Sequence, residues 1–179
     1  MTHTDRPTWD FLADSYWSLP VFYRRALQFS PGGNALAWMG DQTVWHLTGY
    51  RGGYCWGAYA AALFSEGEAN ANPPPRIRQS RIVGSVSAEG RVLINFISGS
   101  GKRESLVTGY GTMVQVQGQW AFQMQMSTGG GGTKLLHRAN MWQTRRGERT
   151  CAKLPGVNYA VSDMLAGASD PTLAEATAD

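Results

Sequence analysis

The chain has 179 residues, of which 16% are charged and 11% aromatic, and its formal net charge at neutral pH is +3. A chain of this size and aromatic content buries enough apolar surface to fold, which excludes an intrinsically disordered protein. The basic residues gather in two short patches, one at Arg76, Arg78 and Arg81 and one around Arg145 and Arg146. Nucleic-acid binding needs a broader basic stripe, so we interpret these patches as solvated charges.

Cys55 and Cys151 are the only cysteines, and no Cys/His cluster accompanies them, so we expect no metal site and no obligatory disulfide. The first seven residues are polar, and no run of about 18 apolar residues occurs. We therefore expect neither a signal peptide nor a membrane span, and the cytoplasm is the expected compartment.

The first third of the chain predicts two helices. Residues 9–17 carry apolar side chains at helical spacing, with Thr8 as a possible N-cap. Pro20 suits the first turn of a second helix over residues 20–29, which the Ser-Pro-Gly-Gly sequence at 30–33 ends.

A strand over 42–48 follows, in which Thr43, Trp45 and Leu47 share one face, and residues 49–53 form a turn. The alanine-rich segment 57–64 favours a helix on propensity, although a strand is possible. Residues 65–75, which contain three prolines, predict a long loop.

The rest of the chain predicts antiparallel strands, because short glycine-containing turns separate runs of β-forming residues. The strands are expected over residues 76–86, 91–97, 104–116, 120–126 and 133–142. We therefore predict one α+β domain over 1–150, with N-terminal helices packed on a strongly curved antiparallel sheet that forms a cone or partial barrel. Residues 151–179 would be an extension that is partly mobile. The alternative is a lipocalin-like β-barrel, and either architecture encloses a hollow.

Two segments resemble the nuclear-transport-factor-like superfamily, which includes SnoaL-like polyketide cyclases, ketosteroid isomerase and scytalone dehydratase. The first runs from Tyr23-Arg-Arg-Ala-Leu27 to Gly40-Asp41-Gln-Thr-Val-Trp45-His46-Leu-Thr-Gly49, and the second includes Gly109-Tyr110-Gly111 and Gly118-Gln-Trp120-Ala-Phe122. The resemblance implies that Tyr23 donates to a developing oxyanion and that His46 occupies the position of the general base. That base is an aspartate in the isomerase, so steroid isomerisation is in doubt while proton transfer stays open.

His46 is the sharpest catalytic candidate, since an imidazole titrates near neutral pH and exchanges protons readily. Tyr23 could stabilise an oxyanion, and Arg51, in a glycine-rich turn, could bind a substrate oxygen. Each of these residues also has a purely structural interpretation. His46 could be hydrogen-bonded to a backbone carbonyl, Tyr23 could be a half-buried helix residue whose hydroxyl reaches water, and Arg51 could be a solvated turn residue. Asp41 could orient a ring or simply begin its strand.

The residues expected to contact substrate are mostly aromatic, because flat side chains favour a flat ligand. They are Trp45, Tyr50, Tyr54, Tyr110, Trp120, Phe122, Met124 and His137.

Three functional hypotheses follow. The first is a cofactor-independent lyase, dehydratase or isomerase that acts on a small apolar, aromatic, oxygenated molecule. The second is a non-catalytic, lipocalin-like carrier, and the third is a structural subunit of a larger complex. We expect no nucleic-acid or membrane partner and a homo-oligomeric state.

Overall fold

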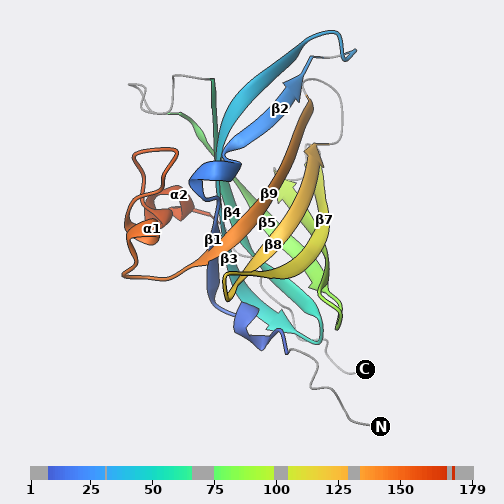
Figure 1. The fold of residues 1–179 in the computed structure, drawn as a ribbon, viewed down its shortest axis with the longest axis vertical. Helices are drawn as coiled ribbons and strands as arrows, with labels where there is room; N and C mark the ends of the chain where they lie inside the picture. The colour runs from blue at the N-terminus through green and yellow to red at the C-terminus, as the bar shows by residue number, and fades with distance from the viewer. Residues whose placement is uncertain are drawn as a thin grey trace.

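The computed structural model describes residues 8–30, 32–65, 75–98, 105–128, 134–168 and 171. These residues form a closed antiparallel β-barrel with only short helices (Figure 1). Its strands are β1 (Ser15–Ser18), β2 (Arg25–Phe29), β3 (Leu36–Arg51), β4 (Tyr54–Ser65), β5 (Ile77–Val86), β6 (Arg91–Ser98), β7 (Ser105–Val116), β8 (Gln119–Thr128) and β9 (Lys134–Thr144). Its helices are the 3₁₀ turns η1 (Asp10–Leu12) and η2 (Val21–Tyr23) and the short α1 (Arg149–Ala152) and α2 (Val161–Leu165).

Strands β3 to β9 follow one another around the barrel in chain order, each paired with the next. β1 and β2 share the remaining position between β9 and β3. At one end β1 pairs Tyr16 with both His46 and Thr144. At the other end β2 pairs Leu27 with both Trp38 and Leu136. The barrel therefore closes with eight strand positions, one of which is filled by two short strands.

Between β1 and β2 the chain leaves the barrel wall at residues 19–24, and we call this interruption the seam. Pro20 lies there and has no N–H to contribute to a sheet, and η2 follows it. Only isolated backbone contacts continue the ladder: the Leu19 N–H donates to the Thr43 carbonyl at 3.2 Å, and the Asp41 N–H donates to the Arg24 carbonyl at 2.8 Å. No strand partner covers residues 41–43 of β3 or 137–141 of β9 on this side.

The predicted N-terminal helices over 9–17 and 20–29 are wrong. Only η1 and η2 are helical, and the rest of these segments contributes β1 and β2. Pairing with a strand on each side satisfies the backbone of both segments, and this long-range pairing overrides the local helical spacing. A closed β-barrel is therefore found in place of the helix-covered cone.

The alanine-rich segment 57–64 is part of β4, so its expected helix is also wrong. Both faces of this strand are covered. Tyr59, Ala61 and Leu63 face the barrel interior, while Ala60 and Ala62 pack under the C-terminal segment. A strand buried on both faces shows no polar alternation, and this is why its sequence resembles a helix.

The five strands predicted after residue 75 are confirmed, as is the strand over 42–48, which is longer than expected. Residue 104, residue 133, the greater part of the loop over 65–75 and the glycine turns at 99–101 and 129–132 lie outside the described residues.

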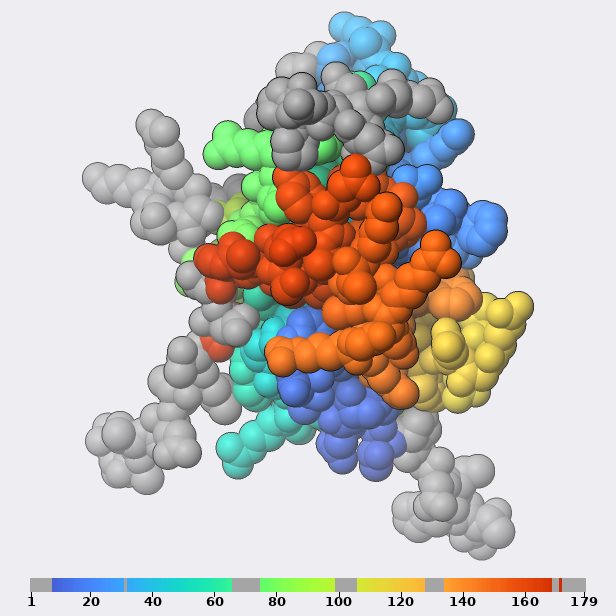
Figure 2. Space-filling view, turned by 90° about the vertical axis from the view of Figure 1, so that its left-hand side faces the viewer, coloured from blue at the N-terminus to red at the C-terminus, as the bar shows by residue number. Residues whose placement is uncertain are grey.

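One end of the barrel interior is solidly packed. Trp45 and Phe122 are fully buried there, and η1 with Trp9 and Leu12 closes this end. A second apolar cluster lies on the outer wall, where Leu154, Val157 and Met164 pack against β3 and β4. Figure 2 shows this C-terminal segment spread over the side of the barrel. The extension over 151–179, expected to be partly mobile, therefore packs on the barrel as far as Leu165, and residues 169, 170 and 172–179 lie outside the described residues. No helix of the described residues is long and apolar enough to cross a membrane.

Candidate functional site

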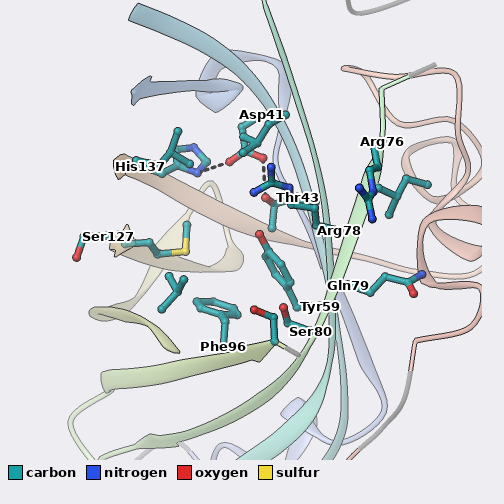
Figure 3. Close-up of a pocket in the computed structure, with 17 residues that line it drawn as sticks. Asp41, Thr43, Tyr59, Arg76, Arg78, Gln79, Ser80, Phe96, Ser127 and His137 are labelled. Carbon is teal, nitrogen blue, oxygen red and sulfur yellow. Dashed lines mark hydrogen bonds and ion pairs between the residues drawn. The ribbon is translucent and has the colours of Figure 1, made fainter. Parts of the chain in front are cut away.

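The end of the barrel near the β2–β3 hairpin holds an open cavity of about 760 Å³. Phe96 lies at its base, where its ring contacts Tyr59 at 4.8 Å and Trp45 at 5.6 Å between centroids. The packed core therefore forms the floor of the cavity. The side chains around it include Asp41, Thr43, Tyr59, Ala61, Leu63, Arg76, Arg78, Ser80, Phe96, Val107, Met126, Leu135 and His137 (Figure 3).

Asp41 and His137 form a buried ion pair in the cavity wall. The Asp41 Oδ2 and His137 Nδ1 atoms are 2.6 Å apart, and the two side chains are 4% and 3% exposed. The other ring nitrogen, Nε2, lies 2.9 Å from the carbonyl oxygen of Tyr23, which can only accept. Nε2 therefore donates to this carbonyl, and Nδ1 faces the Asp41 carboxylate, an arrangement in which a protonated ring would have a partner for both of its N–H groups.

The pKa of His137 is raised above its ordinary value. Burial is the largest single effect and lowers the pKa, but the hydrogen bond to Asp41, the charge of Asp41 and the bond to the Tyr23 carbonyl together outweigh it. The surroundings of the ring thus favour its charged form more than bulk water does.

The ion pair lies at the seam. Because the wall strand is interrupted there, Asp41 on β3 and His137 on β9 contact each other directly, and the Tyr23 carbonyl in η2 has no strand partner. Side-chain hydrogen bonds also cross the seam. Gln42 Nε2 donates to the Leu19 carbonyl at 3.3 Å, and Asn140 Nδ2 donates to the Tyr23 hydroxyl at 3.2 Å. The pair therefore completes the wall as well as lining the cavity.

Tyr59 lies beside the ion pair in the cavity wall. Thr43 Oγ1 donates to Asp41 Oδ1 at 2.7 Å, and both residues are near enough to Tyr59 to influence the pKa of its phenol. Burial, and secondarily the charge of Asp41, raise the pKa of Tyr59 well above its usual range, so its phenol stays protonated. Each carboxylate oxygen of Asp41 thus accepts a hydrogen bond from a neighbouring side chain.

Two arginines add positive charge, Arg76 immediately before β5 and Arg78 within it. Figure 3 shows Arg78 extending from β5 toward Asp41 and Thr43. Arg76 lies two residues earlier in the chain and also lines the cavity. Both side chains are exposed. Among the ion pairs of the described residues, none involves either guanidinium.

The three predicted catalytic residues are not brought together. His46 lies on the outer face of the wall, because its neighbours Trp45 and Leu47 point inward. Its Nε2 is 2.9 Å from Asp14 Oδ1, and its ring stacks on Tyr16 with centroids 4.0 Å apart.

Tyr23 lies at the seam, where its hydroxyl is hydrogen-bonded to Asn140. Arg51 is exposed at the β3–β4 turn, at the far end of the barrel from the cavity.

Of the predicted substrate-contacting residues, only His137 lines the cavity. Trp45, Phe122 and Met124 are fully buried in the packed core. Trp120 packs edge-on against Trp9 at that closed end.

The three predicted tyrosines also lie away from the cavity. Tyr50 packs against the core, and burial, followed by the charge of Asp10, raises its pKa. Tyr54 lines a separate shallow hollow of about 390 Å³. Tyr110 is on the outer face, where its hydroxyl donates to Gln125 at 2.7 Å.

Sequence reasoning missed Thr43, Tyr59, Arg76 and Arg78 as cavity residues. A signal for the arginines exists in the alternation of β5, since Arg76 and Arg78 share a strand face with the buried Ile82 and Val86. Two charges on the apolar face of a strand indicate a polar or open part of the interior.

Within the described part of the chain, no group of three or more histidine, cysteine or carboxylate side chains could hold a metal ion. Comparison with protein-family models, curated proteins and solved structures found no match. The resemblance to the nuclear-transport-factor-like superfamily therefore stays a prediction, and its first segment, Tyr23 to Leu27, contributes to η2 and β2.

Proposed function

We propose that this protein binds one small molecule in the open end of its barrel and releases it unchanged. The observation that carries the proposal is a cavity whose buried polar groups already satisfy one another, beside apolar walls left free for a ligand. Phe96, Val107 and Met126 supply much of that apolar lining. The volume of about 760 Å³ falls within the range of roughly 300–1,000 Å³ that is usual for small-molecule sites.

Binding is favoured over acid–base catalysis because the described residues that line the cavity offer no available base. A general base needs a free lone pair within hydrogen-bonding distance of the substrate. Both nitrogens of the His137 ring and both carboxylate oxygens of Asp41 already have partners within the protein. His46, the candidate base, lies outside the barrel wall.

The test is calorimetric titration with a panel of compact aromatic and aliphatic ligands, followed by mass spectrometry of each mixture. Ala61→Phe and Leu63→Trp add bulk inside the cavity and should reduce affinity at least tenfold. Gln123→Phe, on the exposed outer face of β8, is the matched control and should bind as the wild type does. Binding that survives both cavity variants would contradict the proposal, and a ligand returned with a new mass would restore the catalytic hypothesis.

A second candidate, a subunit that associates with a second copy of itself, is favoured by an apolar row on the outer wall. Trp38, Leu27 and Leu136 are consecutive neighbours across β3, β2 and β9. Trp38 is 59% exposed and Leu136 45% exposed. Light scattering of the wild type and of Trp38→Ser would test this, since the substitution should convert a dimer into a monomer. A wild-type monomer at high concentration would contradict it.

A further inference from the structure

The charges around the cavity do not balance. Among the described lining residues, Asp41 carries a negative charge, while His137, Arg76 and Arg78 carry positive charges. Asp41 and His137 neutralise each other at 2.6 Å. Two guanidiniums remain without an ion-pair partner among the described residues, and low-dielectric walls concentrate the field of such charges inside a cleft.

We infer that the ligand is a compact amphiphile whose carboxylate is bound by Arg78, with Arg76 assisting nearer the rim. This inference rests on the proposed binding function and names the chemical class of the ligand. A guanidinium offers a planar pair of donors that matches a carboxylate, and charge-assisted hydrogen bonds of this kind are stronger than neutral ones. The orientation of Arg78 toward Asp41 and Thr43 places its donors over the cavity (Figure 3).

The remaining walls give the ligand its orientation. Arg76 and Arg78 both lie on the β5 side, whereas Phe96, Val107, Met126 and Leu135 lie on β6, β7, β8 and β9 in that order around the barrel. A carboxylate at β5 therefore places the body of the molecule against a continuous apolar surface on the following strands.

The floor limits the length of that body. Phe96 contacts both Tyr59 and Trp45, and Trp45 is fully buried. An extended alkyl chain cannot pass this layer, so a ring-containing or branched body fits the cavity better than a long chain does.

The experiment compares acids with their uncharged amides. Matched pairs with naphthyl, biphenyl, indolyl and dodecyl bodies are titrated by calorimetry into the wild type and into Arg78→Gln, Arg78→Lys and Arg76→Gln. Arg138→Gln is the control, because Arg138 is exposed on β9 beside His137 and faces outward. Thermal unfolding of each variant verifies that it is folded.

We expect the wild type to bind the cyclic acids at least tenfold more tightly than their amides, with a preference that weakens as salt rises. Arg78→Gln should remove most of this preference without weakening amide binding, Arg78→Lys should restore part of it, and Arg138→Gln should leave it unchanged. Equal affinity for acid and amide in every pair that binds would overturn the inference and leave the binding function standing. If no pair binds the wild type, the proposed function fails together with the inference.

Discussion

His137 on β9 contacts Asp41 on β3 at the seam. At this point neither β1 nor β2 lies between the two strands. The ion pair thus takes over a role that backbone hydrogen bonds fill elsewhere in the barrel. Because it is buried and also lines the cavity, it connects the stability of the protein with the shape of its candidate binding site.

Removing either member of the pair should destabilise the protein strongly. A lone charge would remain in a site with almost no access to water, and breaking a buried ion pair in this way costs about 3–5 kcal/mol. We expect His137→Gln and Asp41→Asn each to fall in this range, and the double variant to cost clearly less than their sum. The free energy of unfolding in urea measures all three. His46→Gln, which removes a pair with the exposed Asp14, should cost no more than about 1 kcal/mol. Additive effects at positions 41 and 137 would contradict the coupling.

The same pair predicts a dependence of stability on pH. The pKa of His137 is raised in the folded state, whereas in the unfolded chain it is about 6.5. The stabilisation is therefore complete below about pH 6.5 and is lost as the pH rises through the folded-state value. The unfolding free energy of the wild type should fall across this window relative to that of His137→Gln. A difference that stays constant between about pH 5.5 and 9 would show that the ring does not titrate with folding.

Gly57 should not tolerate a side chain. A Cβ atom there would overlap the backbone carbonyl oxygen of His46 on the paired strand β3. Since overpacking of a buried site costs about 1–3 kcal/mol, we expect Gly57→Ala to be near the upper end of this range by thermal unfolding. Gly118→Ala is the comparison, because Gly118 has a φ of +79° and an added methyl group would meet no atom within 4 Å. Gly118→Ala should therefore lose only the roughly 1–2 kcal/mol that backbone strain costs, without any steric overlap of the added Cβ atom. If the two variants lose the same stability, overlap at Gly57 is not the cause.

The two cysteines should differ sharply in reactivity. Cys55 is buried in the barrel interior, and burial raises the pKa of its thiol to about 12. Cys151 packs against the outer cluster and is only partly buried. Burial is the largest cause of its raised pKa too, so it should react slowly but measurably with an aromatic disulfide reagent. Cys55 should react only on unfolding. Rapid labelling of Cys55 in Cys151→Ser would contradict this, as would a disulfide joining the two, since the barrel wall separates them.

The strands after residue 75 could be predicted because turn residues delimit them and their alternation is local. β1 and β2 could not, since each is short and gains its strand geometry from partners on β3 and β9 that lie far away in the chain. The same limit applies to β4. Its alanines are compatible with a helix or a strand, and the structure is decided by the neighbouring strands and the C-terminal segment that cover both of its faces.

The candidate site was predictable only in pieces. Asp41 and His137 both stand out in the sequence, and the suggestion that Asp41 orients a ring agrees with its contact to His137. Their proximity depends on how the barrel closes, which no local pattern encodes. The inward direction of Arg78 follows from the alternation of β5, but the interpretation of its basic patch as solvated charge obscures it.

The seam also has a consequence for the order in which the barrel forms. The chain from Ser15 to Phe29 must fit between β3, which follows it closely, and β9, which begins at Lys134. Until β9 is available, the earliest part of the chain can pair on one side only, and β3 and β9 each keep an open edge. Contacts between residues so distant in sequence slow folding, because the connecting chain loses its freedom before the contact forms. The final and slowest event in folding should therefore be the docking of the two ends of the sheet around β1 and β2, with Asp41 and His137 meeting only when that event is complete.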